Sequence, residues 1–156
     1  MYQLSECYQK KENPRANKKM GGAKLDFRAI QYLNLFSKLT GTRSSNCFNY
    51  ADFIIFEVPR FMMSKAIGEH GANIKKLSSI IKKKIKVIPV SSDVEEFIQA
   101  VVYPVNFKKI VNANDELTIF AGSQSKALLI GRGNSRLNEL KEILKTHFNI
   151  KKLKIF

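Results

Sequence analysis

The sequence predicts an α+β protein in which one unit, with the element order α-β-β-α-α-β, occurs twice. Three observations support this prediction. The chain has 156 residues, of which 44% are hydrophobic, enough for one ordinary domain or two small ones. Its apolar residues alternate between helical and strand spacing, and the same succession of spacings occurs in both halves. Each half also contains a glycine-rich corner between two helical stretches.

The N-terminal residues 1–24 are expected to form a basic, flexible tail. Their apolar residues are sparse and follow no period, and Pro14 and the pair Gly21-Gly22 interrupt them. Such an arm can add phosphate contacts without reading sequence, and a purely solvated tail is the alternative. Met20 is an alternative start to Met1. The basic residues of this stretch are Lys10, Lys11, Arg15, Lys18, Lys19 and Lys24.

The first unit is expected to occupy residues 25–92. Its first helix is predicted from about Asp26, which can cap it, to Leu39, and Gly41 follows its end. The buried stripe of this helix is predicted to be Ala29, Ile30, Leu33, Phe36 and Leu39. The strands of the unit are predicted at residues 46–48, 53–58 and 84–90.

The centre of the first unit is the tetrad from Gly68 to Gly71, of the form G-x-x-G. Apolar residues lead into it and out of it at helical spacing, so the tetrad joins two helices through a very short loop. Glycine at both ends permits positive φ and the close approach of another chain. The second helix starts at this loop, where its unpaired N–H groups and its dipole attract phosphate. Lys65, Lys75 and Lys76 place positive charge nearby. A corner that carries glycine for steric reasons alone is the alternative. The apolar face after the tetrad is predicted to be Ile74, Leu77, Ile80 and Ile81.

The second unit is expected to occupy residues 93–156. Asp93 can cap a helix that runs to Tyr103. The buried face of this helix is predicted to be Val94, Phe97, Ile98 and Val101. The corner of the unit lies at residues 131–134, between helices predicted at residues 125–130 and 135–147. Strands are predicted at residues 107–111, 117–121 and 150–155, with a turn at residues 112–115.

An offset of 63 positions aligns the two corners without a gap, since it takes Gly68 to Gly131. Gly71 falls on Asn134, and asparagine is the residue other than glycine that best tolerates positive φ. Two copies of one supersecondary unit, centred on the same corner, are hard to attribute to chance. The matched apolar pairs are Ile67 with Ile130, Ile74 with Leu137, Leu77 with Leu140, Ile80 with Ile143, and Ile81 with Leu144.

The repeated unit resembles the K-homology (KH) domain, in which a G-x-x-G loop clamps about four nucleotides. The element order resembles the type II form, which implies a mixed three-stranded sheet packed on helices in each copy. The pair, with almost no linker, is similar to the archaeal NusA-like transcription factors from about Lys24 to Phe156. Two departures stand out: Glu69 and His70 occupy positions where the family usually carries a basic residue, and the second corner lacks the last glycine. The segments that carry the resemblance are residues 66–74, 95–98, 130–133 and 147–155.

This resemblance implies a transcription termination or antitermination factor that binds single-stranded RNA and acts with RNA polymerase on nascent transcripts. It also implies an archaeal, cytoplasmic protein and a monomer. The loops and helix starts would hold phosphates, cationic side chains would supply charge, and apolar residues would form the wall of a groove. The residues expected to bind RNA are Lys65, Ile67, Gly68, Glu69, His70, Gly71, Asn73, Ile74, Lys75, Lys76, Ile130, Gly131, Arg132, Gly133, Asn134 and Arg136.

The charge balance independently indicates a polyanionic partner. Lysine and arginine outnumber aspartate and glutamate by 27 to 13, which gives a formal charge of +14 and a pI near 9.9. Nucleic acid is the commonest partner of such a chain, and an anionic membrane surface is the rival. No apolar run reaches the length of about 18 residues that a membrane span needs. Residues 1–20 also lack the apolar core of a secretory signal.

The sequence contains no pattern typical of an enzyme. Cys7 and Cys47 form no C-x-x-C pair and no metal-binding spacing with His70 or His147. No P-loop and no nucleophile with a neighbouring base is found, so neither catalysis nor a cofactor is expected. A protein that sits on ribosomal RNA during assembly or processing is the alternative function, with the same chemistry and a different partner.

Overall fold

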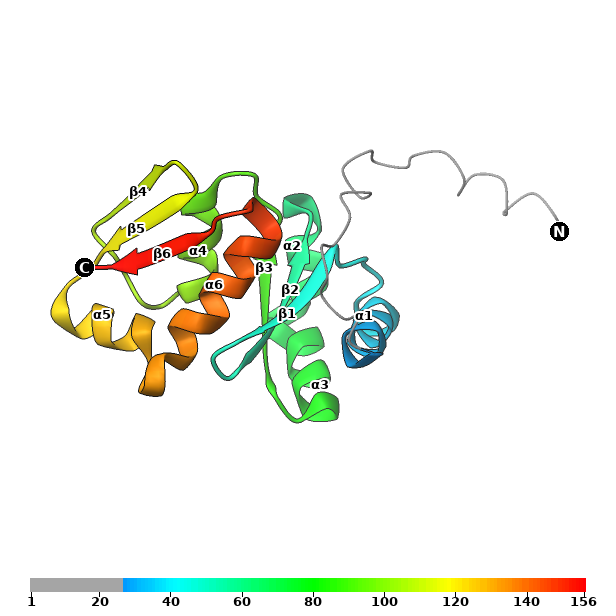
Figure 1. Ribbon diagram of the computed structural model, residues 1–156. Helices are drawn as coiled ribbons and strands as arrows, with labels where there is room; N and C mark the ends of the chain where they lie inside the picture. The colour runs from blue at the N-terminus through cyan, green and yellow to red at the C-terminus, as the bar shows by residue number, and fades with distance from the viewer. Residues whose placement is uncertain (1–26) are drawn as a thin grey trace, which may run out of the picture.

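The computed structural model describes residues 27–156. The expected tail, the cap at Asp26 and the alternative start at Met20 lie outside these residues. Figure 1 shows two small sheets side by side, each with its own helices, and α6 (Ser135–Phe148) between the second sheet and the first half of the molecule. The predicted α+β class, with small mixed sheets and helices, is therefore confirmed.

The first half, residues 27–92, contains one sheet of three strands in the order β1-β2-β3. β1 is antiparallel to β2, and β3 is parallel to it. The central strand is apolar almost throughout because both of its faces are covered. Its elements are α1 (Phe27–Thr40), β1 (Asn46–Tyr50), β2 (Phe53–Val58), η1 (Arg60–Met62), α2 (Met63–Ile67), η2 (Glu69–Gly71), α3 (Ala72–Ile81) and β3 (Lys84–Pro89).

The second half, residues 93–156, has the same order and strand directions, with a sheet β4-β5-β6. The predicted cap is confirmed, because the Asp93 carboxylate accepts a hydrogen bond from the Glu95 N–H at 3.0 Å. The elements are α4 (Val94–Val102), β4 (Lys109–Ala113), β5 (Glu116–Phe120), α5 (Ser123–Ile130), η3 (Arg132–Asn134), α6 (Ser135–Phe148) and β6 (Lys152–Ile155).

The three predicted strands of the second half are displaced by one or two residues, the first two of them for one local reason. Asn114 and Asp115 both have positive φ, which makes a two-residue hairpin turn. β4 therefore continues to Ala113 instead of ending at residue 111, and β5 starts directly after the turn. The last strand starts at Lys152 instead of residue 150, because Asn149 ends α6 in the left-handed region.

Two predicted core residues are exposed. Ile30 is 37% exposed and Ile80 is 56% exposed. Each lies six positions from a residue that packs in the core, Phe36 and Ile74 respectively. Six residues turn a helix to a direction about 120° away from the starting one, so a spacing of six leaves the buried face. The remaining core of the first half includes a stacked pair, Phe36 and Phe56, with ring centroids 4.4 Å apart.

The two copies also differ in the length of their second corner helix. α3 has 10 residues and α6 has 14. The offset of 63 still relates Phe53 to Glu116, but their strand partners Lys84 and Lys152 lie 68 positions apart. The additional residues form the last turn of α6, which contains His147 and packs on the outer face of the first sheet.

That last turn builds a buried polar contact between the halves. His147 Nε2 lies 3.2 Å from the carboxylate of Glu57, which is 3% exposed, and His147 Nδ1 lies 2.9 Å from the Ile143 carbonyl. Burial lowers the pKa of His147, but the hydrogen bond and the charge of Glu57, with the Ile143 carbonyl, raise that pKa more. The ring also packs against Phe48 and Phe97. Because both ring nitrogens face acceptors, the site favours the protonated imidazole.

A second polar contact, half-buried, ties β3 to the end of α4. Lys86 Nζ donates to the Val101 carbonyl at 2.9 Å and to the Tyr103 carbonyl at 2.7 Å. Burial lowers the pKa of Lys86 to about 8. This lysine is therefore held by the C-terminal end of a helix.

Candidate nucleic-acid interface

The two corners have nearly identical backbone conformations. Gly68 has φ 79° and ψ 171°, and Gly131 has φ 71° and ψ 175°. This region of conformational space is essentially restricted to glycine. The residue before the second helix is left-handed in both copies, with φ 72° at Gly71 and φ 61° at Asn134. The prediction that asparagine satisfies the backbone requirement of the missing glycine is confirmed.

A side chain from the following helix fastens each corner, which sequence reasoning missed. Asn73 Nδ2 donates to the Lys65 carbonyl at 3.0 Å, and Arg136 Nη1 donates to the Leu128 carbonyl at 3.2 Å. The offset of 63 relates both donors and both acceptors, so the two contacts are equivalent. The first glycine of each corner is needed for this approach. A Cβ at Gly68 would lie 2.9 Å from the Asn73 side chain, and one at Gly131 would lie 2.9 Å from the Arg136 side chain.

Both corners are open to solvent. The side chains of Glu69 and His70 are each 91% exposed, and Arg132 and Asn134 are exposed as well. Within residues 27–156, no side chain caps the N-terminus of either following helix. The first-turn N–H groups of these helices are therefore not claimed by a capping side chain, and such groups attract anions.

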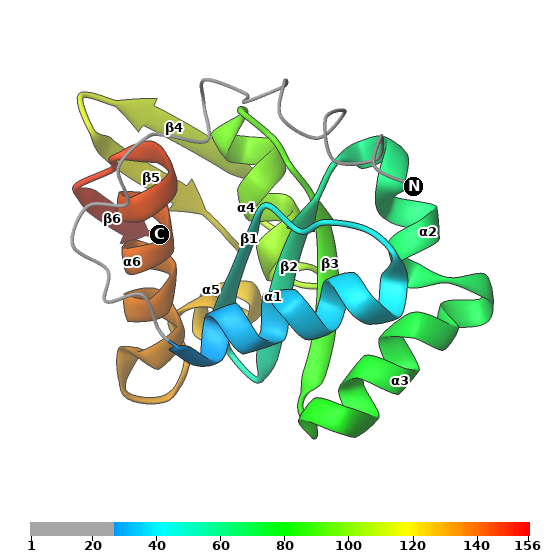
Figure 2. The ribbon, with the colours of Figure 1, turned by 90° about the vertical axis from the view of Figure 1, so that its right-hand side faces the viewer.

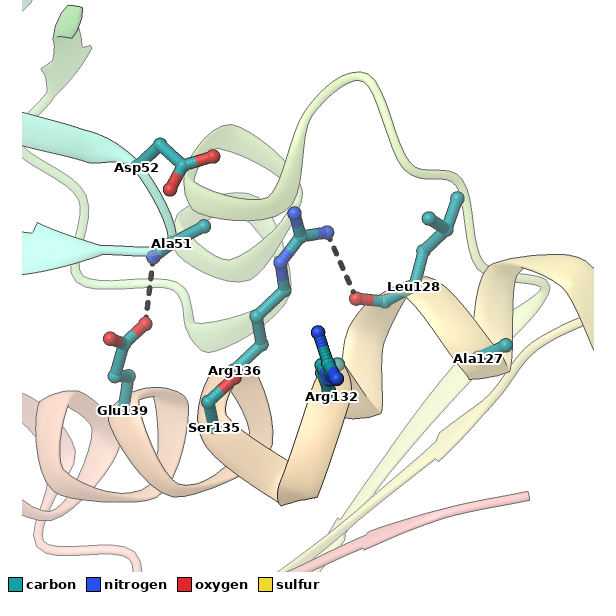
Figure 3. A pocket seen from close by; sticks show the side chains of 9 residues that line it. Ala51, Asp52, Ala127, Leu128, Arg132, Ser135, Arg136 and Glu139 are labelled. Carbon is teal, nitrogen blue, oxygen red and sulfur yellow. Dashed lines mark hydrogen bonds between the residues drawn. The ribbon is translucent and has the colours of Figure 1, made fainter.

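The second corner opens on a pocket of about 460 Å³ that both halves of the molecule line. Figure 3 shows the Arg136 guanidinium between the Leu128 carbonyl, to which it donates, and Ala51 and Asp52, which form the turn between β1 and β2. Glu139 on α6 accepts a hydrogen bond from the Ala51 N–H at 2.7 Å, which fixes this turn beside the corner. The further lining residues are Ala127, Leu128, Gly131, Arg132 and Ser135.

Side chains of positive and of negative charge both line this pocket. Arg132 and Arg136 come from the corner and its helix, and Asp52 is an exposed carboxylate from the other half. Tyr50 lies buried behind the turn. Burial raises its pKa to about 12, with opposing effects of Arg136 and Glu139, so its hydroxyl is neutral. The wall contributed by Ala51, Asp52 and Glu139 could not be found from local sequence patterns, because it joins segments far apart in the chain.

A second depression lies along α3, in the first half. It measures about 500 Å³ and combines an apolar floor with two lysines, Lys75 and Lys84. Ile74 lies in its wall, together with Phe53 and Ile85 at the start of two neighbouring strands. Lys84 and Phe53 were not among the predicted binding residues. The remaining lining residues are Ser78 and Ser79.

The structure brings the predicted residues together in two separate groups. Figure 2 shows the corner between α2 and α3 at one side of the molecule and the corner between α5 and α6 at the opposite side. Gly131, Arg132 and Arg136 share the first pocket, and Ile74 and Lys75 share the depression along α3. Ile67 and Ile130, expected in the groove walls, are half-buried beside their corners and line neither pocket.

The chain was compared with known proteins by sequence and by structure. No model of a known protein family matches the chain. The chain is 30% identical over 87 residues to a Methanococcus vannielii protein named probable transcription termination protein NusA. That match covers 56% of this chain and spans 50% of the length of the relative. A protein of the same name from Halobacterium salinarum is 22% identical over 130 residues, covering 81% of this chain and 94% of that protein.

The fold is also found among solved structures. A structure titled "Crystal structure of APE1850" superposes with a TM-score of 0.63 at 24% identity, covering 83% of this chain and 98% of that one. Among the described residues, no helix is long and apolar enough to cross a bilayer. Residues 27–156 also hold no group of three or more metal-ligating side chains. The chain thus has the fold of that structure and is similar to archaeal proteins named probable NusA.

Proposed function

We propose that this protein binds single-stranded RNA through its two corners, each the loop of a type II KH domain, over residues 25–92 and 93–156. It acts on nascent RNA together with RNA polymerase, as a NusA-like termination or antitermination factor of an archaeal cytoplasm. It binds without catalysing a reaction, and it works as a monomer. The supporting observation is the repeated corner, in which the same backbone angles recur at two open, basic sites.

The first corner supplies a grip on the RNA backbone. At Gly71 the loop presents no side chain to an approaching strand, and the start of α3 offers N–H groups to a phosphate. Lys65, Lys75 and Lys76 are exposed around it and add the positive charge that phosphate binding requires. The side chains of His70 and Glu69 are equally exposed, and Glu69 Oε1 lies 3.9 Å from His70 Nε2.

The second corner adds the means to recognise a base. Arg132 is exposed, and it can pair with a phosphate through its planar guanidinium. The pocket beside it is large enough for an unstacked nucleobase and carries hydrogen-bonding groups, including the Asp52 carboxylate. RNA proteins read sequence on the edges of such unstacked bases. This corner therefore has the greater capacity for selectivity.

Negative charge introduced into both corners tests the proposal. The corner variant carries Glu69→Asp, His70→Asp, Arg132→Asp and Gly133→Asp. Aspartate tolerates the left-handed backbone at His70 and Gly133, so the fold is expected to persist. Binding to a fluorescently labelled single-stranded RNA of about 12 nucleotides is measured by anisotropy. We expect affinity to fall at least about tenfold, the effect of losing one or two charge-assisted contacts.

Lys141→Glu is the matched control for the Arg132→Asp part of this variant. It changes the net charge by the same amount on the exposed face of α6, away from the pocket. The proposal requires this control to weaken binding much less than the corner variant does. Equal affinity of the corner variant and the unmodified protein would refute the assignment of both loops.

A further inference from the structure

The outer face of the second sheet carries two aromatic rings in one row. Leu117 and Ile119 point into the core, so Phe120 lies on the opposite face of β5. The ladder continues beyond β6, because the Phe156 N–H donates to the Ile119 carbonyl at 2.8 Å and the Phe156 carbonyl accepts from the Ala121 N–H at 2.7 Å. Phe120 and Phe156 are thereby fixed side by side, with ring centroids 5.9 Å apart and planes inclined by 24°.

These rings are exposed and are surrounded by lysines. Phe120 is 39% exposed and Phe156 is 57% exposed. Lys109 pairs with Phe120 across the sheet, and Lys152 and Lys154 stand on the same face of β6. The only carboxylate on this face of the three described strands, Glu116, is already paired with Lys154 at 2.5 Å. The face therefore combines bare aromatic surface with net positive charge.

The equivalent face of the first sheet is covered, not exposed. There Glu57 and Ile88 occupy the positions of Phe120 and Phe156, and this face, which includes Phe48 and Ile55, is packed under α4 and α6 of the second half. The carboxylate on that face, Glu57, is buried against His147. Among residues 27–156 no element covers the second sheet in the same way, and Figure 1 shows this sheet at the outer end of the molecule.

We propose that this face, the aromatic platform of Phe120, Phe156, Lys109, Lys152 and Lys154, is a second binding surface for single-stranded RNA, separate from the two corners. Bases would stack on the two rings, and the lysines would meet the phosphates that flank them. Aromatic side chains on an open sheet are a recurring way to bind unpaired bases.

The charges on the platform favour RNA over a protein partner or the chain's own N-terminal segment. A docked protein would have to bury the lysine ammonium groups, which is costly unless it supplied carboxylates for those that Glu116 does not pair. Residues 1–26 carry mostly positive charge and would be repelled by the platform. A polyanion leaves the ammonium groups hydrated at its phosphates while its bases cover the apolar rings.

The test compares Phe120→Leu, Phe120→Tyr and Phe61→Leu in the full chain. Leucine preserves apolar contact with Phe156 but cannot stack on a base, and tyrosine can. Phe61 is 82% exposed on η1 and is the matched control. Affinity for labelled polyuridine of about 12 nucleotides is measured by anisotropy in low salt. Phe120→Leu should bind at least about fivefold more weakly, the effect of losing one stacked base, while Phe120→Tyr and Phe61→Leu should match the unmodified protein.

Photocrosslinking separates this inference from the proposed function. RNA that carries 4-thiouridine should crosslink to the peptides that contain Phe120 or Phe156, both in the unmodified protein and in the corner variant. If Phe120→Leu bound RNA as tightly as the unmodified protein while the corner variant bound it more weakly, the inference would be overturned and the proposed function would stand. If Phe120→Leu bound more weakly while the corner variant bound normally, the corners would be excluded as RNA sites and the platform would be supported. If Phe120→Leu abolished self-association or binding to a protein and left RNA affinity unchanged, the platform would be a protein contact and the inference would be wrong.

Discussion

Replacing Gly68 by alanine should destabilise the protein far more than the same change at Gly71, although both glycines bound the same loop. At Gly68 the backbone lies at φ 79° and ψ 171°, where a residue with a Cβ incurs about 1–3 kcal/mol of strain. The new Cβ would also lie 2.9 Å from Asn73 Cγ and 3.0 Å from the Asn73 backbone nitrogen. That nitrogen belongs to α3 and cannot rotate away, so the corner itself must open.

Gly71 presents the opposite case. It lies in the left-handed region at φ 72° and ψ 22°, and a Cβ there meets no atom within 4 Å. The cost should be about 1 kcal/mol, the usual penalty for a left-handed alanine. For Gly68→Ala we expect about 3 kcal/mol, the strain and the contact together. In a protein of this size the melting temperature should fall by about 6–12 °C for Gly68→Ala and about 2–4 °C for Gly71→Ala.

Thermal and urea unfolding followed by circular dichroism provide the assay, with both variants in the same buffer. An equal loss of stability for the two variants, or a larger loss for Gly71→Ala, would refute the reasoning. It would mean that Asn73 on α3 does not confine residue 68, and that glycine is needed at this position only for the approach of a ligand. RNA affinity measured on the folded fraction then separates the two requirements.

Three further outcomes are expected. The pKa of His147 is raised in the folded state, so its contact with Glu57 stabilises the protein fully below the unfolded pKa of about 6.5 and less as pH rises through the folded value. The difference in melting temperature between the unmodified protein and His147→Gln should therefore shrink from pH 6 to pH 8, and a constant difference would contradict this. Asn73→Ala should cost about 1 kcal/mol of stability through loss of its hydrogen bond to the Lys65 carbonyl, measured by urea unfolding. RNA affinity should fall steeply with salt concentration, and a flat dependence would remove phosphate contacts from the account.

The sequence predicted the features that depend on local backbone requirements. The corner conformation could be predicted from Gly68, Gly131 and Asn134, because few other residue types tolerate positive φ. Asp93 was readable as a cap for the same kind of reason. Ile30 and Ile80 were wrongly predicted to be buried because they are apolar. Each lies six positions from a core residue, and that spacing takes a side chain off the buried face of a helix.

Features that join distant segments could not be predicted in this way. The wall of the pocket beside the second corner depends on a contact between Ala51 and Glu139, which are 88 positions apart. Nothing near either residue signals the other. The same is true of Glu57 and His147, 90 positions apart, each of which looks like an ordinary surface residue in its own segment. A repeat detected by offset predicts what the copies share, whereas these contacts depend on how one copy packs against the other.

The extra turn of α6 explains why two similar copies are expected to act differently. It carries His147 onto the first sheet and covers the face around Phe48, which takes that face out of contact with any ligand. The same docking brings the turn at Ala51 and Asp52 beside the second corner and adds a polar wall there. The first corner receives no such wall from the second half, since the depression near it is lined by residues of the first half alone. If the proposed function holds, the first corner should contribute affinity through phosphates, and the second should contribute selectivity as well. A strand that reaches both corners must cross the molecule, because they lie on opposite sides.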